Sequence, residues 1–154
     1  MPPPLRELEH ERRAARHRTV GTALIDAGDE WGAVPLFYCA YHLLKAAMLV
    51  DPIWHAPGDL HKLHTDLIAD DRFTDRHKGR RRPGGGPKEW GINDLVMLLY
   101  RPMVRDYEVL HQASVTVRYG AGLPADVELS SLVDACDRIA AAYAAGSIAA
   151  TPPA

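Results

Sequence analysis

Cysteine is scarce in this chain, which has only Cys39 and Cys136 among its 154 residues. Each lies within an apolar pattern of helical period, and so small a number excludes the disulfide framework that holds small secreted domains together. An excess of one charge is also lacking, because 18 Lys and Arg residues nearly balance 20 Asp and Glu residues. A formal net charge of −2 argues against a protein that chiefly coats nucleic acid, although positive charge can still be concentrated locally.

We also expect no strands, no membrane span and no leader. No segment alternates apolar and polar residues as a half-buried strand does. The most apolar stretch, residues 31–50, is interrupted by polar side chains and is short for a bilayer, which needs about 20 apolar residues. Charged residues follow directly after Met1 and three prolines, where a signal peptide would be apolar. We therefore expect an all-α, cytoplasmic protein with no membrane partner.

Residues 31–50, WGAVPLFYCAYHLLKAAMLV, form the stretch around which the rest of the chain is arranged. The polar residues Tyr38, His42 and Lys45 occur at i, i+4 and i+7, which places them on one line along a helix. The remaining circumference is apolar and available for packing. The pattern predicts the central helix of a bundle, with these three side chains at the edge of the core.

The other periodic segments predict an up-and-down bundle of about five helices in one domain, residues 1–150, followed by a tail at 151–154. The expected helices cover residues 5–27, 31–50, a short segment capped by Asp59, 93–119 and 125–145. The first half of helix 5–27 is so charged that we expect it to project from the bundle or to cover it thinly. Pro102 predicts a kink or a break within 93–119. The expected core contains Phe37, Leu44, Met48, Leu110 and Leu132, each of which lies on the apolar stripe of its helix.

The segment 72–91 has many helix breakers and no periodicity, which indicates a long flexible loop before the fourth helix. Residues 76–82, RHKGRRR, form the one strongly positive run of the chain. Such a run attracts a phosphate backbone or an acidic partner, and a solvated loop is the alternative interpretation. The candidate nucleic-acid-binding residues are Lys78, Arg80, Arg81, Arg82 and, near the end of the fourth helix, Arg118.

Metal binding is a further alternative. Glu7 and His10, like Glu108 and His111, have the Glu-x-x-His spacing of di-iron bundles, but the central helix offers no carboxylate to complete such a site. The histidines His55, His61 and His64, with Asp59, could hold zinc. A polar helix face explains the same residues more simply, and we predict no metal and no cofactor.

Residues 31–49 resemble the second helix of HEPN domains, which shows an aromatic residue, a tyrosine–alanine–histidine pattern and an alanine-rich apolar run. The spacing of Tyr107, Leu110, Ser114 and Arg118, followed by Tyr119 and Gly120, is similar to the end of that family's long fourth helix. The resemblance covers residues 18–146. It implies a homodimeric helical bundle in a prokaryotic system linked to nucleic acid, of toxin–antitoxin or defence type.

The resemblance implies two activities. Many HEPN domains are metal-independent ribonucleases that carry an Arg-x4–6-His motif in a dimer cleft, where histidine moves protons and arginine stabilises the transition state. Others lack the motif and act as binding or interaction modules, often beside a nucleotidyltransferase.

The motif spacing occurs three times in this chain, as often as chance allows, and Arg105 with His111 is the pair on the fourth helix. Six residues rotate a helix by about 120° from one face to another, so this pair fits the motif poorly. We expect a binding or accessory module whose partners are RNA or a nucleotide, and a nucleotidyltransferase or an antitoxin. The alternative is a ribonuclease that uses Arg105 and His111.

Overall fold

The computed structural model describes residues 5–80, 84, 86 and 88–150. Helices account for the regular structure of this part of the chain, and its only bridge between extended segments joins Arg80 to Glu89. The all-α prediction is therefore confirmed. The six α-helices are α1 (Glu7–Asp26), α2 (Ala33–Val50), α3 (Pro57–Leu63), α4 (Ile92–Leu99), α5 (Val104–Tyr119) and α6 (Leu129–Ala144). Short 3₁₀ helices lie between them: η1 (Glu30–Gly32), η2 (Pro52–His55), η3 (Ala69–Phe73) and η4 (Arg101–Met103).

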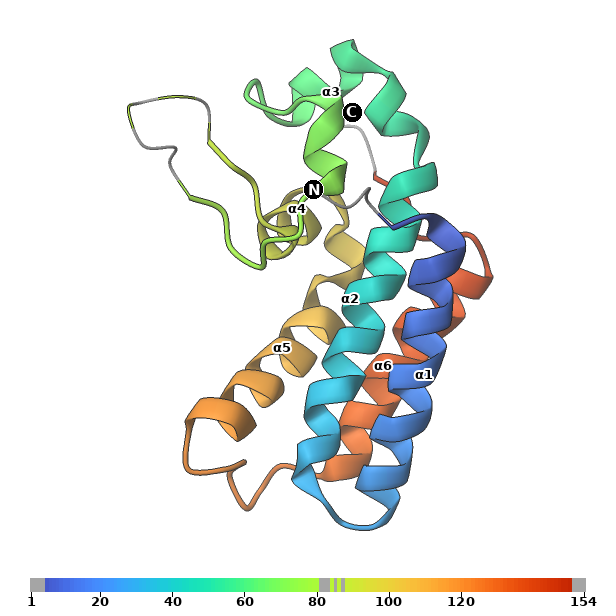
Figure 1. Ribbon diagram of the computed structural model, residues 1–154, viewed down its shortest axis with the longest axis vertical. Coiled ribbons are helices and arrows are strands. Elements are labelled where there is room, and N and C mark those ends of the chain that lie inside the picture. Colours follow the sequence, from blue (N-terminus) through green and yellow to red (C-terminus); the bar gives the residue numbers. More distant parts are fainter. Residues whose placement is uncertain (1–4, 81–83, 85, 87, 151–154) are drawn as a thin grey trace.

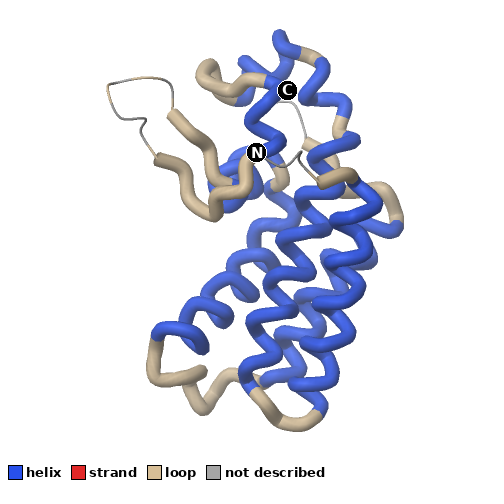
Figure 2. The backbone as a smooth tube through the Cα atoms, in the orientation of Figure 1, coloured by secondary structure: helices blue, strands red, loops and turns tan. Residues whose placement is uncertain are grey.

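The long helices α1, α2, α5 and α6 run up and down beside one another, as Figure 1 shows. Helix α2 lies between the others and contacts each of them. Helices α3 and α4 are at one end of this bundle, where the chain crosses from α2 to α5. The two described arms of the segment between η3 and α4 extend to one side, as loops outside the helical body (Figure 2).

The core is centred on α2, in which every side chain from Leu36 to Met48 is buried apart from the half-buried Tyr38. Its residues Phe37, Leu44 and Met48 are completely enclosed and share one cluster with Leu110 of α5 and Leu132 of α6. This confirms the predicted core.

Length and composition alone would allow the stretch Glu30–His55 to cross a membrane, contrary to our estimate that it is too short. The flanking 3₁₀ turns extend the helical stretch beyond the residues that we counted. Its most apolar window is 72% buried against the rest of the chain, as in the core helix of a soluble protein.

Helix α1 packs closely on α2, because two glycines allow their backbones to approach. A Cβ atom at Gly21 would lie 2.7 Å from Leu36 Cγ, and one at Gly32 would lie 2.7 Å from the carbonyl oxygen of Gly21. The charged first half of α1 was expected to project or to cover the bundle thinly, which is wrong. Its His10 and Ala14 are buried, since the charged residues of this half occupy only the outer faces of the helix.

Three helix boundaries differ from the predicted ones or refine them. Pro102 separates α4 from α5 at η4, so the predicted break is real and produces two helices. Asp59 is not an N-cap: α3 begins at Pro57, whose missing N–H suits a first helical position, and Asp59 lies in the first turn. The last helix begins at Leu129, because residues 125–128 still form a turn and an extended connection.

A buried carboxylate joins the end of α2 to two other parts of the chain. Asp51 is only 5% exposed and accepts hydrogen bonds from the Tyr100 hydroxyl and the Ala150 N–H, each 2.8 Å long. It also accepts one from the backbone N–H of Ile53 at 3.0 Å. The indole of Trp54 donates to the Tyr100 oxygen at 3.3 Å. Buried carboxylates persist only when they are bonded in this way.

Replacement of Leu44 by alanine tests the central position of α2. The change leaves a cavity among side chains that cannot collapse, and we expect it to lower the free energy of unfolding by about 2–5 kcal/mol. Leu8→Ala is the matched control, because Leu8 is 54% exposed on α1. Urea unfolding monitored by circular dichroism measures both. A loss below about 1 kcal/mol for Leu44→Ala would contradict the assigned core.

Candidate functional site

The polar line of α2 faces α1 and the segment that follows η3. His42 and Lys45 are 7% and 3% exposed, so they lie deeper than the core edge at which we expected them. Tyr38 is half-buried. Lys45 Nζ donates to the carbonyl oxygen of Thr74 and lies 3.3 Å from the Asp75 carboxylate. Thus the line is used for internal contacts with a distant part of the sequence.

His42 belongs to a group of rings that we call the histidine cluster: His10, His17, His42, His77 and His111. The Nδ1 atoms of His10 and His42 are 2.9 Å apart. His17 stacks nearly parallel on His42, with ring centroids 5.6 Å apart. These three rings come from α1 and α2.

Aromatic side chains of α2 connect the two parts of the cluster. The Tyr38 ring lies 5.7 Å from His17 and 5.8 Å from His77. Phe37 is 5.8 Å from His77 and 5.1 Å from His111. Four separate segments of the chain therefore bring five of its eight histidines to one side of α2.

The cluster was not predicted as a unit. The available signal was helical periodicity: His10 and His17 are seven residues apart on α1, and Tyr38, His42 and Lys45 form a line on α2. Nothing in the sequence says that these two lines face each other, or that His77 and His111 continue them.

Burial lowers the pKa of His10 to about 4 and that of His42 to about 3. Nearby positive groups add to the effect, including Lys45 and Arg13 for both rings. The pKa values of the three remaining members, His17, His77 and His111, are also lowered. Burial is the largest cause, and neighbouring cations add a smaller effect. The cluster is therefore uncharged at neutral pH, with imidazoles that can donate or accept a hydrogen bond.

His111 is held by a short chain of hydrogen bonds. The Tyr107 hydroxyl donates to Asn93 Oδ1 at 2.7 Å, which turns the amide nitrogen toward His111. Asn93 Nδ2 lies 3.3 Å from His111 Nε2. In this arrangement Nε2 accepts, and the proton of the neutral ring is on Nδ1.

The arginine whose charge lowers the pKa of His111 is Arg118, which lies seven residues later on the same face of α5. Its positive charge lowers the pKa of His77 and of His111. Its Nε donates to the carbonyl oxygen of Ser114 at 3.3 Å. Arg105 is exposed on α5, and its spacing of six residues places it about 120° around the helix from His111.

The two arms of the basic loop are joined at its base. Arg80 and Glu89 exchange two backbone hydrogen bonds of 2.8 Å. The Glu89 carboxylate pairs with Arg80 at 2.7 Å and with Arg76 at 3.2 Å. A side chain at Gly91 would clash with the carbonyl carbon of Lys78, so glycine is needed there. Lys78 is exposed, and Arg81 and Arg82 lie outside the described residues.

No group of three metal-ligating side chains with the placement of a metal site occurs in the described part of the chain. His64 accepts a hydrogen bond from the Asp66 N–H at 3.1 Å and packs edge-on against Trp90. His61 is exposed. The Glu7 carboxylate accepts a 3.4 Å hydrogen bond from the Tyr143 hydroxyl. The histidines and glutamates with ligand-like spacing are therefore used in other contacts or exposed to solvent.

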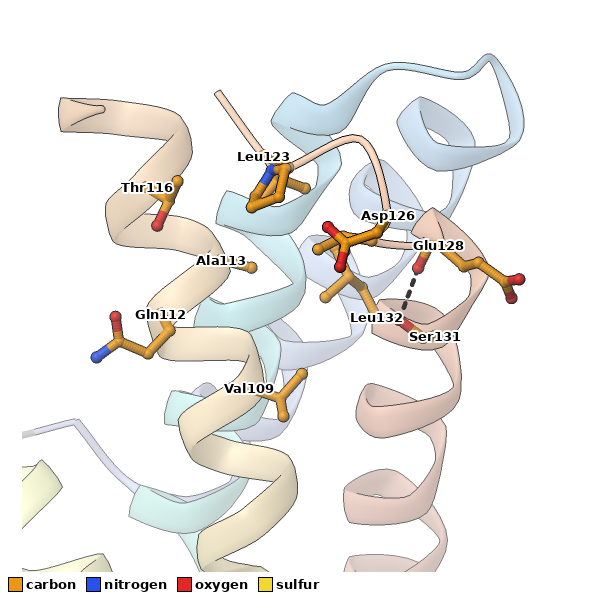
Figure 3. Close-up of a pocket in the computed structure, with 11 residues that line it drawn as sticks. Val109, Gln112, Ala113, Thr116, Leu123, Asp126, Glu128, Ser131 and Leu132 are labelled. Carbon is orange, nitrogen blue, oxygen red and sulfur yellow. Dashed lines mark hydrogen bonds between the residues drawn. The ribbon is translucent and has the colours of Figure 1, made fainter. Parts of the chain in front are cut away.

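A groove separate from the cluster lies between α5 and α6 and has a volume of about 530 Å³. Figure 3 shows Val109 and Ala113 of α5 opposite Leu132 of α6, with Leu123 at the closed end. Its rim is polar, and the Ser131 hydroxyl there donates to the carbonyl oxygen of Glu128 at 2.6 Å. The groove is mostly apolar and is one of the places where another molecule can pack on the bundle.

Comparisons with protein families, with curated proteins and with solved structures find no match to this chain. What the site can do must therefore be argued from its chemistry. It combines neutral imidazoles with two cations, Lys78 of the basic loop and Arg118 of α5, whose charges lower the pKa of His111. Such an arrangement suits a bound anion, because N–H donors and positive charge act together.

The buried pair His10 and His42 predicts acid lability. Their pKa values in the fold are below the usual 6.5, so the unfolded state binds more protons as pH falls. Stability is full above about pH 6.5 and should decrease as the pH falls from there through the folded pKa values of about 4 and about 3, by about 2 kcal/mol per histidine at pH 5. Thermal unfolding at pH 7, 6 and 5 measures this loss. His42→Phe should reduce the loss of stability on acidification, whereas His61→Phe, at an exposed site, should not. Equal losses in the wild type and both variants would refute the assignment of His42 as a buried, uncharged histidine.

Proposed function

We propose that the chain is a HEPN-like, cytoplasmic binding or accessory module of a prokaryotic system linked to nucleic acid, of toxin–antitoxin or defence type. The observation that carries the proposal is the position of Lys78 and Arg118, whose positive charges both act on His111. Cations and neutral N–H donors at one place suit the phosphates of RNA. Lys78 belongs to the basic loop, so a backbone bound at His111 can continue along that loop.

The contacts of His111 favour binding over catalysis. Its Nε2 already accepts a hydrogen bond from Asn93, which leaves the Nδ1–H as a donor. A donor holds a phosphate oxygen but does not remove a proton from a ribose hydroxyl. Arg105, the arginine that the ribonuclease motif would require, is exposed on another side of α5.

The ribonuclease that uses Arg105 and His111 remains the alternative function. The observation in its favour is the lowered pKa of His77 and His111, because a neutral imidazole is the form that a general base needs at pH 7. Catalysis would then require Asn93 to release Nε2 on RNA binding.

Two arginines on one helix provide a matched test of RNA binding. Arg118→Ala should weaken binding of a single-stranded RNA about 3- to 10-fold. It should also reduce the slope of log affinity against log salt concentration by the equivalent of about one phosphate contact. Arg105→Ala removes the same charge from an exposed site of α5 and should leave affinity nearly unchanged. Fluorescence anisotropy from 50 to 200 mM salt measures both. Wild-type protein that binds no RNA, or an equal loss in the two variants, would refute the assigned phosphate site.

The same samples separate the two functions. A metal-independent ribonuclease would cut RNA in EDTA and leave a 2′,3′-cyclic phosphate, because the attacking group is the RNA's own hydroxyl. Loss of cutting in both His111→Ala and Arg105→Ala would establish the enzyme. RNA that is bound and stays intact supports the binding module.

The proposed module is a homodimer, with a nucleotidyltransferase or an antitoxin as further partner. The α5–α6 groove supports the dimer, since Val109 is 43% exposed beside an apolar lining (Figure 3). Large exposed apolar residues at the rim of a groove are typical of interfaces.

The dimer can be tested with two exposed valines. Sedimentation of the wild type at micromolar concentration should give a dimer, and Val109→Glu should give a monomer because a carboxylate would be buried in the interface. Val20→Glu is the control, since Val20 is 46% exposed on α1, away from the groove. A wild-type monomer would exclude the dimer, and a dimeric Val109→Glu would place its interface elsewhere.

A further inference from the structure

Tyr119, the last residue of α5, has an aromatic ring that the fold does not bury. It is 78% exposed, more than any other large hydrophobic side chain in the part of the chain that the structure describes. The other five tyrosines of the chain are buried or half-buried. A single exposed aromatic residue is ordinary on a protein surface, so its neighbours decide what it can do.

The guanidinium group of Arg118 lies against this ring. The Arg118 Cζ atom is 5.1 Å from the ring centroid of Tyr119. Arg118 is half-buried, and its Nε donates to the carbonyl oxygen of Ser114 at 3.3 Å, which holds the guanidinium group on α5. One guanidinium group covers only one face of a planar ring. Because Tyr119 is so exposed, its opposite face is open to a second planar group.

The backbone that carries Tyr119 is fixed as well. The N–H of Gly120 donates to the carbonyl oxygen of Thr116 at 2.8 Å, and a Cβ at Gly120 would lie 2.7 Å from that oxygen. The Leu123 N–H then donates to the Glu30 carboxylate at 2.9 Å, which ties this turn to η1 at the same end of the bundle (Figure 1). A ligand that meets the ring therefore orders little of the backbone.

Tyr119 is close to the proposed phosphate site. The charge of the adjacent Arg118 lowers the pKa of His77 and of His111. Eight residues separate His111 from Tyr119, a distance of about 12 Å along α5, which a few nucleotides can span. Proteins that bind single-stranded RNA combine cations along the backbone with aromatic rings on which bases stack. The end of α5 has both.

We infer that Tyr119 is the stacking residue for one base of a single-stranded RNA whose phosphates are held at Arg118 and His111. The inference rests on the proposed RNA binding, and it adds that a base contributes to affinity beside the phosphates. Stacking of this kind tolerates any sequence, because every base has a π-face. It requires an unpaired base, so the protein should prefer single-stranded to double-stranded RNA.

The test compares two oligonucleotides of equal length and charge: oligouridylate, and the same ribose–phosphate chain without bases. The wild type should bind the oligouridylate about 5- to 30-fold more tightly, as measured by fluorescence anisotropy. Tyr119→Leu should remove most of this difference, whereas Tyr119→Phe should keep it because the aromatic ring is retained. Both variants should fold, since the side chain is exposed.

The matched control is Trp31→Leu, which removes another exposed ring, 50% exposed in η1, and should leave the difference between the two oligonucleotides unchanged. If the wild type binds neither oligonucleotide, the proposed RNA binding fails. If it binds both equally, only the stacking role of Tyr119 is refuted and the phosphate site stands. An equal loss in Trp31→Leu and Tyr119→Leu would also overturn the assignment to Tyr119.

Two further measurements decide whether Tyr119 touches a base. RNA that carries 5-iodouridine should, after irradiation, form a cross-link that peptide mapping places at Tyr119; cross-links found only at other residues would contradict the inference. Sedimentation of Tyr119→Leu should match that of the wild type. A variant that changes its oligomeric state but keeps the preference for oligouridylate would show that Tyr119 belongs to a protein interface instead.

Discussion

Burial of α2 on all sides is the constraint on which the rest of the structure depends. A helix enclosed by α1, α5 and α6 cannot leave a polar side chain without a partner, because desolvation would cost several kcal/mol. His42 meets His10, and Lys45 meets the carbonyl oxygen of Thr74. These partners fix the position of α1 along α2 and hold the chain after η3 against the bundle. The polar line on α2 therefore decides where the neighbouring segments lie.

The same contacts connect stability to the proposed function. The segment that supplies the carbonyl group for Lys45 continues within a few residues to His77 and Lys78. Asp94 then accepts from the backbone N–H groups of Gly79 and Gly91 and closes the base of the loop. Because these bonds fix the base of the loop, Lys78 and Arg80 are held in position there, which lowers the entropy lost when a ligand binds. Thr74, which holds the buried Lys45, and the proposed binding residue Lys78 are thus only four residues apart.

Local patterns predicted the fold well and the site poorly, for a physical reason. Helical period and proline geometry act over a few residues, so the core of α2 and the break at Pro102 could be predicted from the sequence. The histidine cluster is assembled by tertiary packing of four segments, and no local signal records which faces meet. The spacing on α5 did exclude a shared face for Arg105 and His111, but it could not indicate that His77 would join Arg118 and His111. The resemblance to HEPN domains stays a prediction.

The network around Asp51 has a consequence for where the folded unit ends. Helix α6 finishes at Ala144, yet Ile148 is buried and the Ala150 N–H is a donor to the enclosed carboxylate. A protease cut just after α6 would remove no helix, but it would take one of the donors from Asp51 and the buried Ile148 from the core. Trimming the chain at its last helical residue is thus more damaging than helix boundaries suggest, and the six residues beyond it are part of the folded unit.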